Sequence, residues 1–338
     1  MMVTKDKKKL ARVIATWVVT SVMLSVFILD IVVVSLANKY VSQVNIEDHN
    51  FNNISGDDKI HFLDTANSDC ILIESNGHFV LVDSGEGNEN PRRKTEYKGY
   101  LEEVLSYIKK VATKDDGKAH LDFIVATHMH YDHSGNFEAI ISNDSFIIDK
   151  AFIKDYDGSL TSSMDSEKWG NKQTYEKIID SLNNKNIEII NNIPDDEFEF
   201  YDFKMRFINT RTPLEFAAAG ENANSIGIIL SKGSKKAFLA ADFTNDGGFE
   251  MNYAEEIGDI DLLKIGHHGY YGSSSKGFLK ILKPEIAICT NYIGKIYPNV
   301  KWNLTMVANA PVFSTAHRDG IIATFTDEDE ILLTQKIM

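Results

Sequence analysis

Three histidines and one aspartate lie within six consecutive positions of this 338-residue chain. They are His128, His130, Asp132 and His133, in the run THMHYDHSG. In extended backbone, side chains two positions apart point to the same side, so His128 and His130 can bind one metal ion. Asp132 and His133 follow on a turn and can bind a second ion beside it. Imidazole and carboxylate are good zinc ligands, and a two-metal site suits hydrolysis.

Further potential ligands stand directly after short apolar runs. Asp83 follows FVLV, Asp242 follows AFLAA, and the pair His267-His268 follows DLLKIG. Apolar runs of this length are typical of buried strands, and open α/β sheets place their sites beyond strand ends. These positions favour a common site over a surface histidine cluster without a role.

The motif His-x-His-x-Asp-His, with these strand-end residues, resembles the metallo-β-lactamase superfamily over roughly residues 59–335. The resemblance implies an α/β fold, namely a four-layer αββα sandwich with a dinuclear site at one edge. It implies two divalent metal ions, zinc or alternatively manganese. The metal ligands that it implies are His128, His130, Asp132, His133, Asp242 and His268.

The resemblance also suggests how the ligands are shared. We expect His128 and His130 on one ion, Asp132 and His133 on the other, and Asp242 as the bridge between them. Asp83 is expected outside the ligand set, where it holds a ligand histidine through its second nitrogen.

The adjacent residues His267 and His268, which follow DLLKIG, are expected to have different roles. We assign His268 to the metal and His267 to the substrate phosphate or to proton donation, and the reverse assignment stays open. Asp132 and His267 are the residues expected to take part in catalysis.

One departure from the superfamily pattern narrows the function. Many members place another histidine ligand before the bridging aspartate, but this chain has no histidine between His133 and His267. That absence disfavours a β-lactamase or a glyoxalase II-like thioesterase. With the segments NANS at 222–225 and GHHG at 266–269, the chain looks more similar to two branches. These are the phosphorylcholine esterase domain of choline-binding surface proteins and the C-terminal domain of the DNA-uptake competence channel.

The two branches imply different substrates. The first predicts a hydrolase that cleaves a phosphodiester or phosphorylcholine-type ester at the cell envelope, by attack of a metal-held hydroxide on phosphorus. The second predicts a metal-dependent nuclease. A non-catalytic envelope binding module is a third alternative, which the intact ligand set disfavours.

Several residues near these motifs have two interpretations. Asn224 and Ser225 can cap a strand or contact the site. Tyr270 and Tyr271 can pack on the sandwich or line a pocket for a quaternary ammonium group, which aromatic faces attract. Trp169 and Trp302 share that second ambiguity, and His317 is expected in a structural turn.

Alternating strands and helices are expected to position the site within one hydrolase domain, residues 59–338. The periodicity of apolar residues predicts helices at 95–111, 169–182, 276–282 and 300–308. Strands are expected at 60–63, 71–74, 79–82, 123–127, 187–190, 205–208, 225–230, 237–241, 261–265, 286–290 and 321–325.

Net charge divides the chain unevenly. The whole chain carries −14. Because residues 1–12 carry +4 and residues 13–37 carry −1, residues 38–338 carry −17. A body of that charge repels polyanions, so nucleic acid is a disfavoured partner unless bound cations reverse the sign locally.

The N-terminal segment resembles a membrane anchor. As a helix, residues 13–37 would span about 37 Å, enough for a hydrocarbon core of about 30 Å, and Asp30 would reach the far interface. The basic residues of 1–12 predict a cytoplasmic head, so the catalytic domain would be extracytoplasmic on a single-pass protein of the cell membrane. A cleaved signal peptide is the alternative, because Ser35-Leu36-Ala37 resembles a cleavage site. The polar residues 38–58 are predicted to form a linker.

Overall fold

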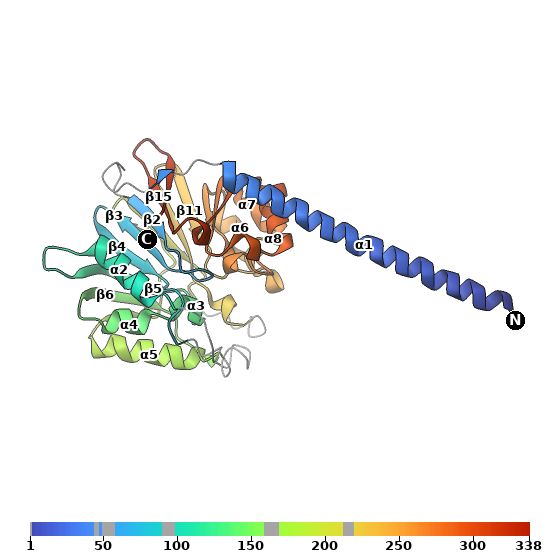
Figure 1. Ribbon diagram of the computed structural model, residues 1–338. Coiled ribbons are helices and arrows are strands. Elements are labelled where there is room, and N and C mark those ends of the chain that lie inside the picture. The colour runs from blue at the N-terminus through green and yellow to red at the C-terminus, as the bar shows by residue number, and fades with distance from the viewer. Residues whose placement is uncertain (1, 44–46, 49–57, 90–98, 159–168, 212–219) are drawn as a thin grey trace.

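The computed structural model describes residues 2–43, 47–48, 58–89, 99–158, 169–211 and 220–338. Two mixed β-sheets face each other, and helices cover the outer side of each sheet (Figure 1). The domain therefore has the four-layer αββα architecture of the metallo-β-lactamase fold, as the sequence predicted.

The first sheet has the strand order β1-β16-β15-β2-β3-β4-β5-β6-β7. Strands β4 to β7 run parallel, so the carboxyl ends of β4 and β5 lie at one edge of the sheet. The strands are β1 (Glu47–Asp48), β2 (Asp58–Phe62), β3 (Ile71–Ser75), β4 (His78–Val82), β5 (Ala119–Ala126), β6 (Phe146–Ile153), β7 (Glu188–Ile190), β15 (Ile321–Phe325) and β16 (Ile331–Gln335).

The second sheet has the order β14-β13-β12-β11-β10-β9-β8. Strands β11 to β14 run parallel, which brings the carboxyl ends of β11 and β12 together. The strands are β8 (Phe198–Phe200), β9 (Phe203–Ile208), β10 (Gly227–Lys232), β11 (Lys235–Leu239), β12 (Leu262–Lys264), β13 (Ile286–Cys289) and β14 (Val312–Ser314).

Helices on the outer faces pack through apolar stripes. In α2 (Leu101–Ala112), Val104, Ile108 and Ala112 face the first sheet, and acidic residues in the first turn and lysines in the last turn complement the helix dipole. The other α-helices of the domain are α3 (Tyr131–Ser134), α4 (Phe137–Ser142), α5 (Asn171–Asn184), α6 (Phe249–Ile257), α7 (Lys276–Leu282) and α8 (Pro298–Trp302).

Short helical turns complete the connections. They are η3 (Glu221–Asn224), η4 (Asp246–Gly248), η5 (Gly266–Gly269), η6 (Ile293–Lys295), the π-helical η7 (Asn303–Ala308) and η8 (Thr315–His317).

Three layers of buried side chains hold the sandwich together. The middle layer lies between the sheets and is rich in phenylalanine, including Phe123, Phe207 and Phe325. One outer layer lies under α2, α4 and α5, and the other under α6, α7 and α8. Because both faces of each sheet are covered, the central strands are apolar at nearly every position, which is why they appear in the sequence as continuous apolar runs.

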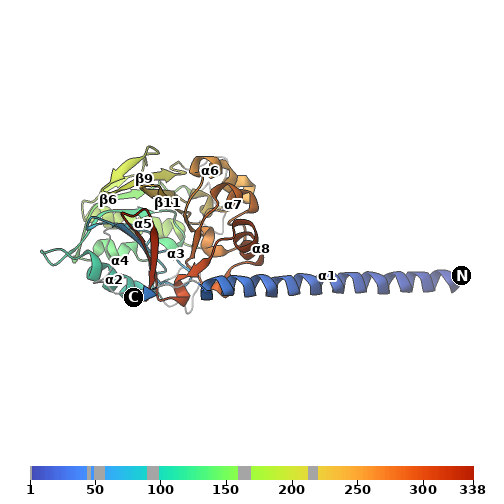
Figure 2. The same ribbon diagram turned by 90° about the horizontal axis from the view of Figure 1, so that it is seen from above.

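The N-terminal helix α1 (Met2–Gln43) projects from the domain, as Figures 1 and 2 show from two directions. Its segment Lys7–Leu36 has a mean hydropathy of 2.5 and is long and apolar enough to cross a membrane. The helix runs past Ala37, and β1 and the start of β2 fall within the predicted linker 38–58. The domain limits themselves stay predictions.

Candidate metal centre

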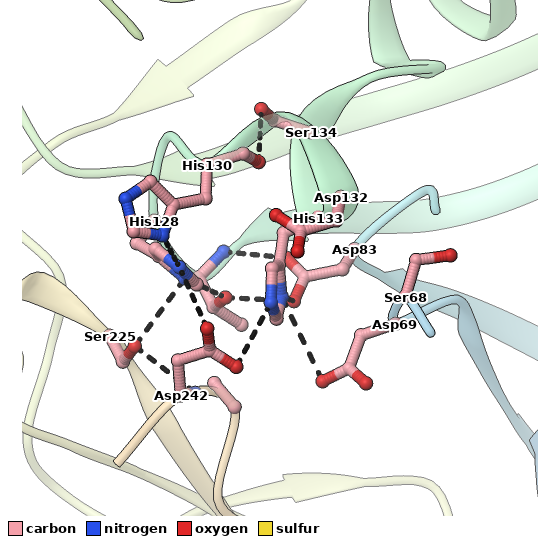
Figure 3. A network of polar contacts seen from close by, with 12 residues as sticks. Ser68, Asp69, Asp83, His128, His130, Asp132, His133, Ser134, Ser225 and Asp242 are labelled. Atoms are coloured by element: carbon pink, nitrogen blue, oxygen red, sulfur yellow. Dashed lines mark hydrogen bonds and ion pairs between the residues drawn. The ribbon is translucent and has the colours of Figure 1, made fainter. Parts of the chain in front are cut away.

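The carboxyl ends of three strands bring the predicted ligands to one place. His128 and His130 follow β5, and Asp132 and His133 lie on α3 directly after them. Asp242 follows β11 from the opposite sheet, and Figure 3 shows its carboxylate pointing between His128 and His133. His268 follows β12 in η5. All of these side chains are buried.

One group of ligand atoms forms around Oδ1 of Asp242. This oxygen lies 3.0 Å from Nε2 of His133 and 3.4 Å from Nε2 of His268. The two Nε2 atoms are themselves 3.1 Å apart. Together with Asp69, these residues form a set whose ligand atoms all lie within 4.8 Å of one another.

Hydrogen bonds fix which nitrogen of each ring carries the proton. Nδ1 of His133 lies 2.7 Å from Oδ2 of Asp83, so this nitrogen donates and Nε2 is left with its lone pair. This is the role that the sequence predicted for Asp83. The Thr127 hydroxyl donates to the same carboxylate oxygen at 2.8 Å, so its lone pair accepts from Nδ1 of His128 at 3.1 Å.

A threonine and an aspartate also orient the ring of His268, which follows a strand of the second sheet. The Thr290 hydroxyl donates to Oδ1 of Asp69 at 2.6 Å, and its oxygen lies 3.1 Å from Nδ1 of His268. Nδ1 of His268 therefore donates to Thr290 and Asp69, and Nε2 presents its lone pair toward Asp242.

A second group forms around the other oxygen of Asp242. Oδ2 of this carboxylate lies 3.6 Å from Nε2 of His128, which is 3.2 Å from Nδ1 of His130. Burial lowers the pKa of His128 to about 3, so its ring is neutral at pH 7. Asp242 is the residue that both groups share, which is the position of a bridging ligand.

This arrangement fits divalent cations. In each group, buried lone pairs face one another at short distances, and Oδ1 of Asp242 accepts no hydrogen bond from any residue that the structure describes. Such lone pairs repel unless a proton or a cation lies between them. Burial opposes a charge on His133, but Asp242 and Asp83 raise its pKa well above the usual histidine range. A metal ion would take the place of that proton.

Asp69 is a site residue that the sequence analysis missed. It precedes the strand β3 rather than following one, so the search for ligands after apolar runs passed over it. Its carboxylate forms an ion pair with Lys264, which is completely buried in β12. A lysine inside the apolar run DLLKI was the available signal, because a buried ammonium needs a carboxylate partner.

Asp132 lies at the edge of the centre. Its Oδ2 is 3.9 Å from Nε2 of His268, and it does not belong to either compact group of ligand atoms among the described residues. Its predicted roles in metal binding and catalysis stay predictions.

His267 and His268 occupy different environments. His268 is completely buried, whereas the side chain of His267 is 27% exposed and its Nε2 lies 3.9 Å from Oδ2 of Asp242. Both residues have positive φ angles, 48° and 50°, which turns the two rings in different directions. Gly266 permits the turn, since a Cβ there would lie 2.4 Å from the Phe243 carbonyl oxygen. The assignment of His268 to metal and His267 to substrate agrees with this placement and stays a prediction.

Some of the residues for which the sequence left two interpretations open lie at the metal centre, and others do not. Ser225 contacts the centre, because its Oγ accepts the Asp242 amide at 3.2 Å. Asn224 instead binds Glu221. The rings of Trp169 and Tyr270 lie 5.1 Å from His130 and 5.6 Å from His267, respectively.

Residues 63–148 match the sequence profile of the metallo-β-lactamase superfamily. Among curated proteins, the chain is 24% identical over 246 residues to ComE operon protein 3 of Bacillus subtilis, covering 70% of this chain and 28% of that protein. It is 26% identical over 107 residues to Recombination protein 2 of Haemophilus influenzae, covering 32% of this chain and 12% of that protein. The chain therefore spans well under half the length of either relative. Both support the relation to the competence channel that the sequence predicted.

Two solved structures are similar to the chain at low sequence identity. The metallo-β-lactamase fold protein YhfI from Bacillus subtilis is 14% identical with a TM-score of 0.43, covering 76% of this chain and 95% of that one. An isothiocyanate hydrolase from Delia radicum gut bacteria is 14% identical with a TM-score of 0.44, covering 79% of this chain and 99% of that one.

Proposed function

We propose that the protein is a dinuclear metal hydrolase of phosphoesters, with the metallo-β-lactamase superfamily domain that residues 63–148 match, and that α1 anchors it in the cell membrane. The substrate would be a phosphodiester or a phosphorylcholine-type ester at the cell envelope. The relation to the phosphorylcholine esterase domain supports this choice and is itself a prediction.

One observation carries the proposal, namely that the two ligand groups share Asp242. Its two oxygens point to different groups, and the neighbouring imidazoles direct lone pairs toward them. Two divalent cations bound there would supply a nucleophile at neutral pH and neutralise charge on the phosphoryl oxygens. The ligand types favour zinc, with manganese as the alternative.

The residues around the ligands have their own tasks. His267 is the partly exposed histidine of the centre, and its Nε2 lies 3.3 Å from Nδ2 of Asn222. From that position it is suited to contact a substrate phosphate or to deliver a proton to a leaving group. Asp83 and Asp69 hold the rings of His133 and His268 in the orientation that a metal needs.

A nuclease is the second candidate. The name of the Haemophilus influenzae relative, Recombination protein 2, favours it. The charge of −17 on residues 38–338 opposes it, because a long polyanion is repelled outside the immediate cleavage point.

The test compares Asp242→Ala with Asp144→Ala in the full chain purified in detergent. Asp144 is an exposed aspartate paired with Lys185, and it belongs to neither group of ligand atoms. Elemental analysis would measure bound metal after loading with zinc or manganese. Hydrolysis would be followed with p-nitrophenylphosphorylcholine, bis-p-nitrophenyl phosphate and single-stranded DNA.

We expect Asp242→Ala to lose both metal ions and turnover together, while Asp144→Ala keeps both. An Asp242→Ala protein that loses its metal but keeps its turnover would contradict the mechanism. Rapid cleavage of DNA with little activity on the two small esters would favour the nuclease.

A further inference from the structure

We propose that a face of the catalytic domain, formed by residues 270–309, docks on the lipid surface of the membrane that α1 crosses. We call it the docking face; it comprises α7, η6, α8, η7 and the segments between them. The inference rests on the proposed anchoring by α1 and does not depend on the proposed chemistry of the metal centre.

The first argument is the position of α1. In both views of the molecule, α7 and α8 lie on the side of the domain from which α1 projects (Figures 1 and 2). Between α1 and α8 lies an apolar hollow of about 590 Å³, and among its lining residues are Val22, Val26, Phe27, Pro298 and Trp302. On this side, the catalytic domain therefore lies directly against the membrane segment of α1.

The depth of that contact can be worked out from helix geometry. If the hydrocarbon core begins after Arg12, a core of about 30 Å ends about 20 residues later. Val22 to Phe27 then lie in the outer half of the core. The hollow beside α8 continues along α1 to Val33, which lies just past the end of such a core, so the outer end of the hollow is at the level of the lipid interface.

The second argument is the kind of side chain exposed on the docking face. Tyr271 is 67% exposed, Met306 52%, Tyr297 43% and Trp302 37%. Tryptophan and tyrosine favour the boundary between lipid and water, where the ring is in an apolar environment and its polar atom stays hydrated. In water alone, such a group of exposed apolar side chains is unfavourable.

The third argument is charge. Residues 270–309 contain five lysines and one acidic residue, Glu285, a balance of +4 in a chain of net charge −14. Three of these lysines, Lys276, Lys280 and Lys295, are exposed on the docking face itself. A basic surface with exposed aromatic rings fits anionic lipid headgroups.

The docking face also lies close to the metal centre. The ring of Tyr270 is 5.6 Å from His267 and 6.2 Å from the ring of Tyr297, which in turn lies 6.0 Å from Tyr271. Tyr297 directly precedes Pro298, a lining residue of the hollow beside α1. A docked domain would hold its centre beside the bilayer, where it meets phosphoesters presented at the lipid surface.

The test places nitroxide labels on single cysteines in the full chain, reconstituted in lipid nanodiscs that contain phosphatidylglycerol. The native Cys70 and Cys289 are completely buried, so labels react at the introduced sites. The variants are Tyr271→Cys and Met306→Cys on the docking face and Leu24→Cys within α1. Tyr201→Cys is the matched control, because Tyr201 is a 44% exposed tyrosine that stacks on His78, at the end of β4 opposite the ligands.

Collision with oxygen, which concentrates in lipid, is compared with collision with a water-soluble nickel chelate. We expect labels at 24, 271 and 306 to favour oxygen and the label at 201 to favour nickel. If the label at 24 is in lipid but those at 271 and 306 collide mainly with nickel, docking is wrong while the anchor stands. If the label at 24 is also in water, the anchor itself is wrong, and docking with it.

Charge is tested with Lys276→Glu, Lys280→Glu and Lys295→Glu combined, against Lys172→Glu on α5, another exposed lysine. The triple change should increase nickel collision at 271 and 306, and the control should not. Equal collision rates in both would contradict the role of charge in docking. Protection of position 271 by single-stranded DNA but not by lipid would overturn the proposal in favour of a nucleic-acid surface.

Discussion

At the level of single residues, the centre depends on threonine and aspartate pairs that orient the histidines. Asp83 with Thr127 serves His133 and His128, and Asp69 with Thr290 serves His268. In each case the hydroxyl hydrogen is committed to the carboxylate, so the threonine oxygen can only accept. That arrangement places a proton on Nδ1 and leaves Nε2 as the atom that a metal would bind, in place of the proton that the raised pKa of His133 favours there.

We expect Asp69→Asn to destabilise the protein by about 3–5 kcal/mol, because it leaves the buried ammonium of Lys264 without its carboxylate. Chemical unfolding in detergent would measure the loss. Adding Lys264→Met to Asp69→Asn should restore part of it, since the double variant buries no uncompensated charge. Equal stability of Asp69→Asn and the unmodified protein would show that the ion pair does not stabilise the fold.

The two adjacent histidines should separate metal binding from turnover. We expect His268→Ala to lose at least one metal ion, because its Nε2 is within 3.4 Å of Asp242. His267→Ala should keep the metal content and lower kcat about 100-fold, the usual scale for a general acid or base. Elemental analysis beside steady-state kinetics would check both, and metal loss in His267→Ala alone would reverse the assignment.

The sequence predicted most of these residues but not the whole site. The spacing of His128, His130 and His133 singled out these three residues, and Asp242 and His268 were chosen because they stand after apolar runs; that all five bind metal stays a prediction. Asp69 was missed, because its role depends on Lys264 and Thr290, which are distant in sequence. Contacts between sheets do not leave a local pattern.

At the level of elements, strands buried on both faces were the easiest to predict. The strands β3, β4, β11 and β15 lie at or within one or two residues of the predicted ranges. β6 was missed because Asp149 and Lys150 interrupt its apolar pattern, and β14 because it has only three residues. The predicted helix 300–308 begins earlier, at Pro298, and continues as a π-helix after Trp302, a change of winding that periodicity does not reveal.

Glu250 joins two of these elements and should make stability depend on pH. This residue of α6 accepts the backbone N–H groups of Ser274 and Ser275, just before α7. Burial raises its pKa to about 7, against these hydrogen bonds. The unfolded chain releases the proton near pH 4.5 and the folded chain near pH 7. The folded state therefore binds more protons in that window, and the free energy of unfolding should fall as pH rises through it.

Glu250→Gln would remove this contribution. Unfolding curves from pH 4 to 8 should show a smaller decline in the variant than in the unmodified protein. Glu255→Gln, at an exposed position of the same helix, is the control and should leave the decline unchanged. A decline of the same size in Glu250→Gln would assign the effect to other groups.

At the level of the whole molecule, charge and hydropathy suggest how the chain lies across a membrane. Residues 1–12, with a charge of +4, precede the apolar segment of α1, and the acidic body follows the helix. Burial lowers the pKa of Lys301 on α8, while the nearby carboxylate of Asp30 opposes that shift. The one acidic residue of the apolar segment thus faces a lysine of the domain. The sequence predicted its place near an interface but not this partner.

Orientation should follow the basic head. With alkaline phosphatase fused to the C-terminus, we expect high phosphatase activity, since the enzyme is active only outside the cytoplasm. Replacing Lys7, Lys8, Lys9 and Arg12 with glutamine should lower that activity severalfold, because the positive-inside bias is lost. Replacing Lys172 and Lys177 of the domain with glutamine should not change it. A bright C-terminal green fluorescent protein fusion would instead place the domain in the cytoplasm.

The ligands come from both halves of the sandwich: His128, His130 and His133 follow a strand of the first sheet, and Asp242 and His268 follow strands of the second. Any cation that binds there joins the two sheets across their shared edge. Metal binding would then stabilise the packing of the two sheets. Free metal at 100 times its dissociation constant would add about 2.7 kcal/mol to the free energy of unfolding. Outside the cytoplasm, where the proposed orientation places the domain, a shortage of metal would shorten the lifetime of the protein as well as abolish its activity.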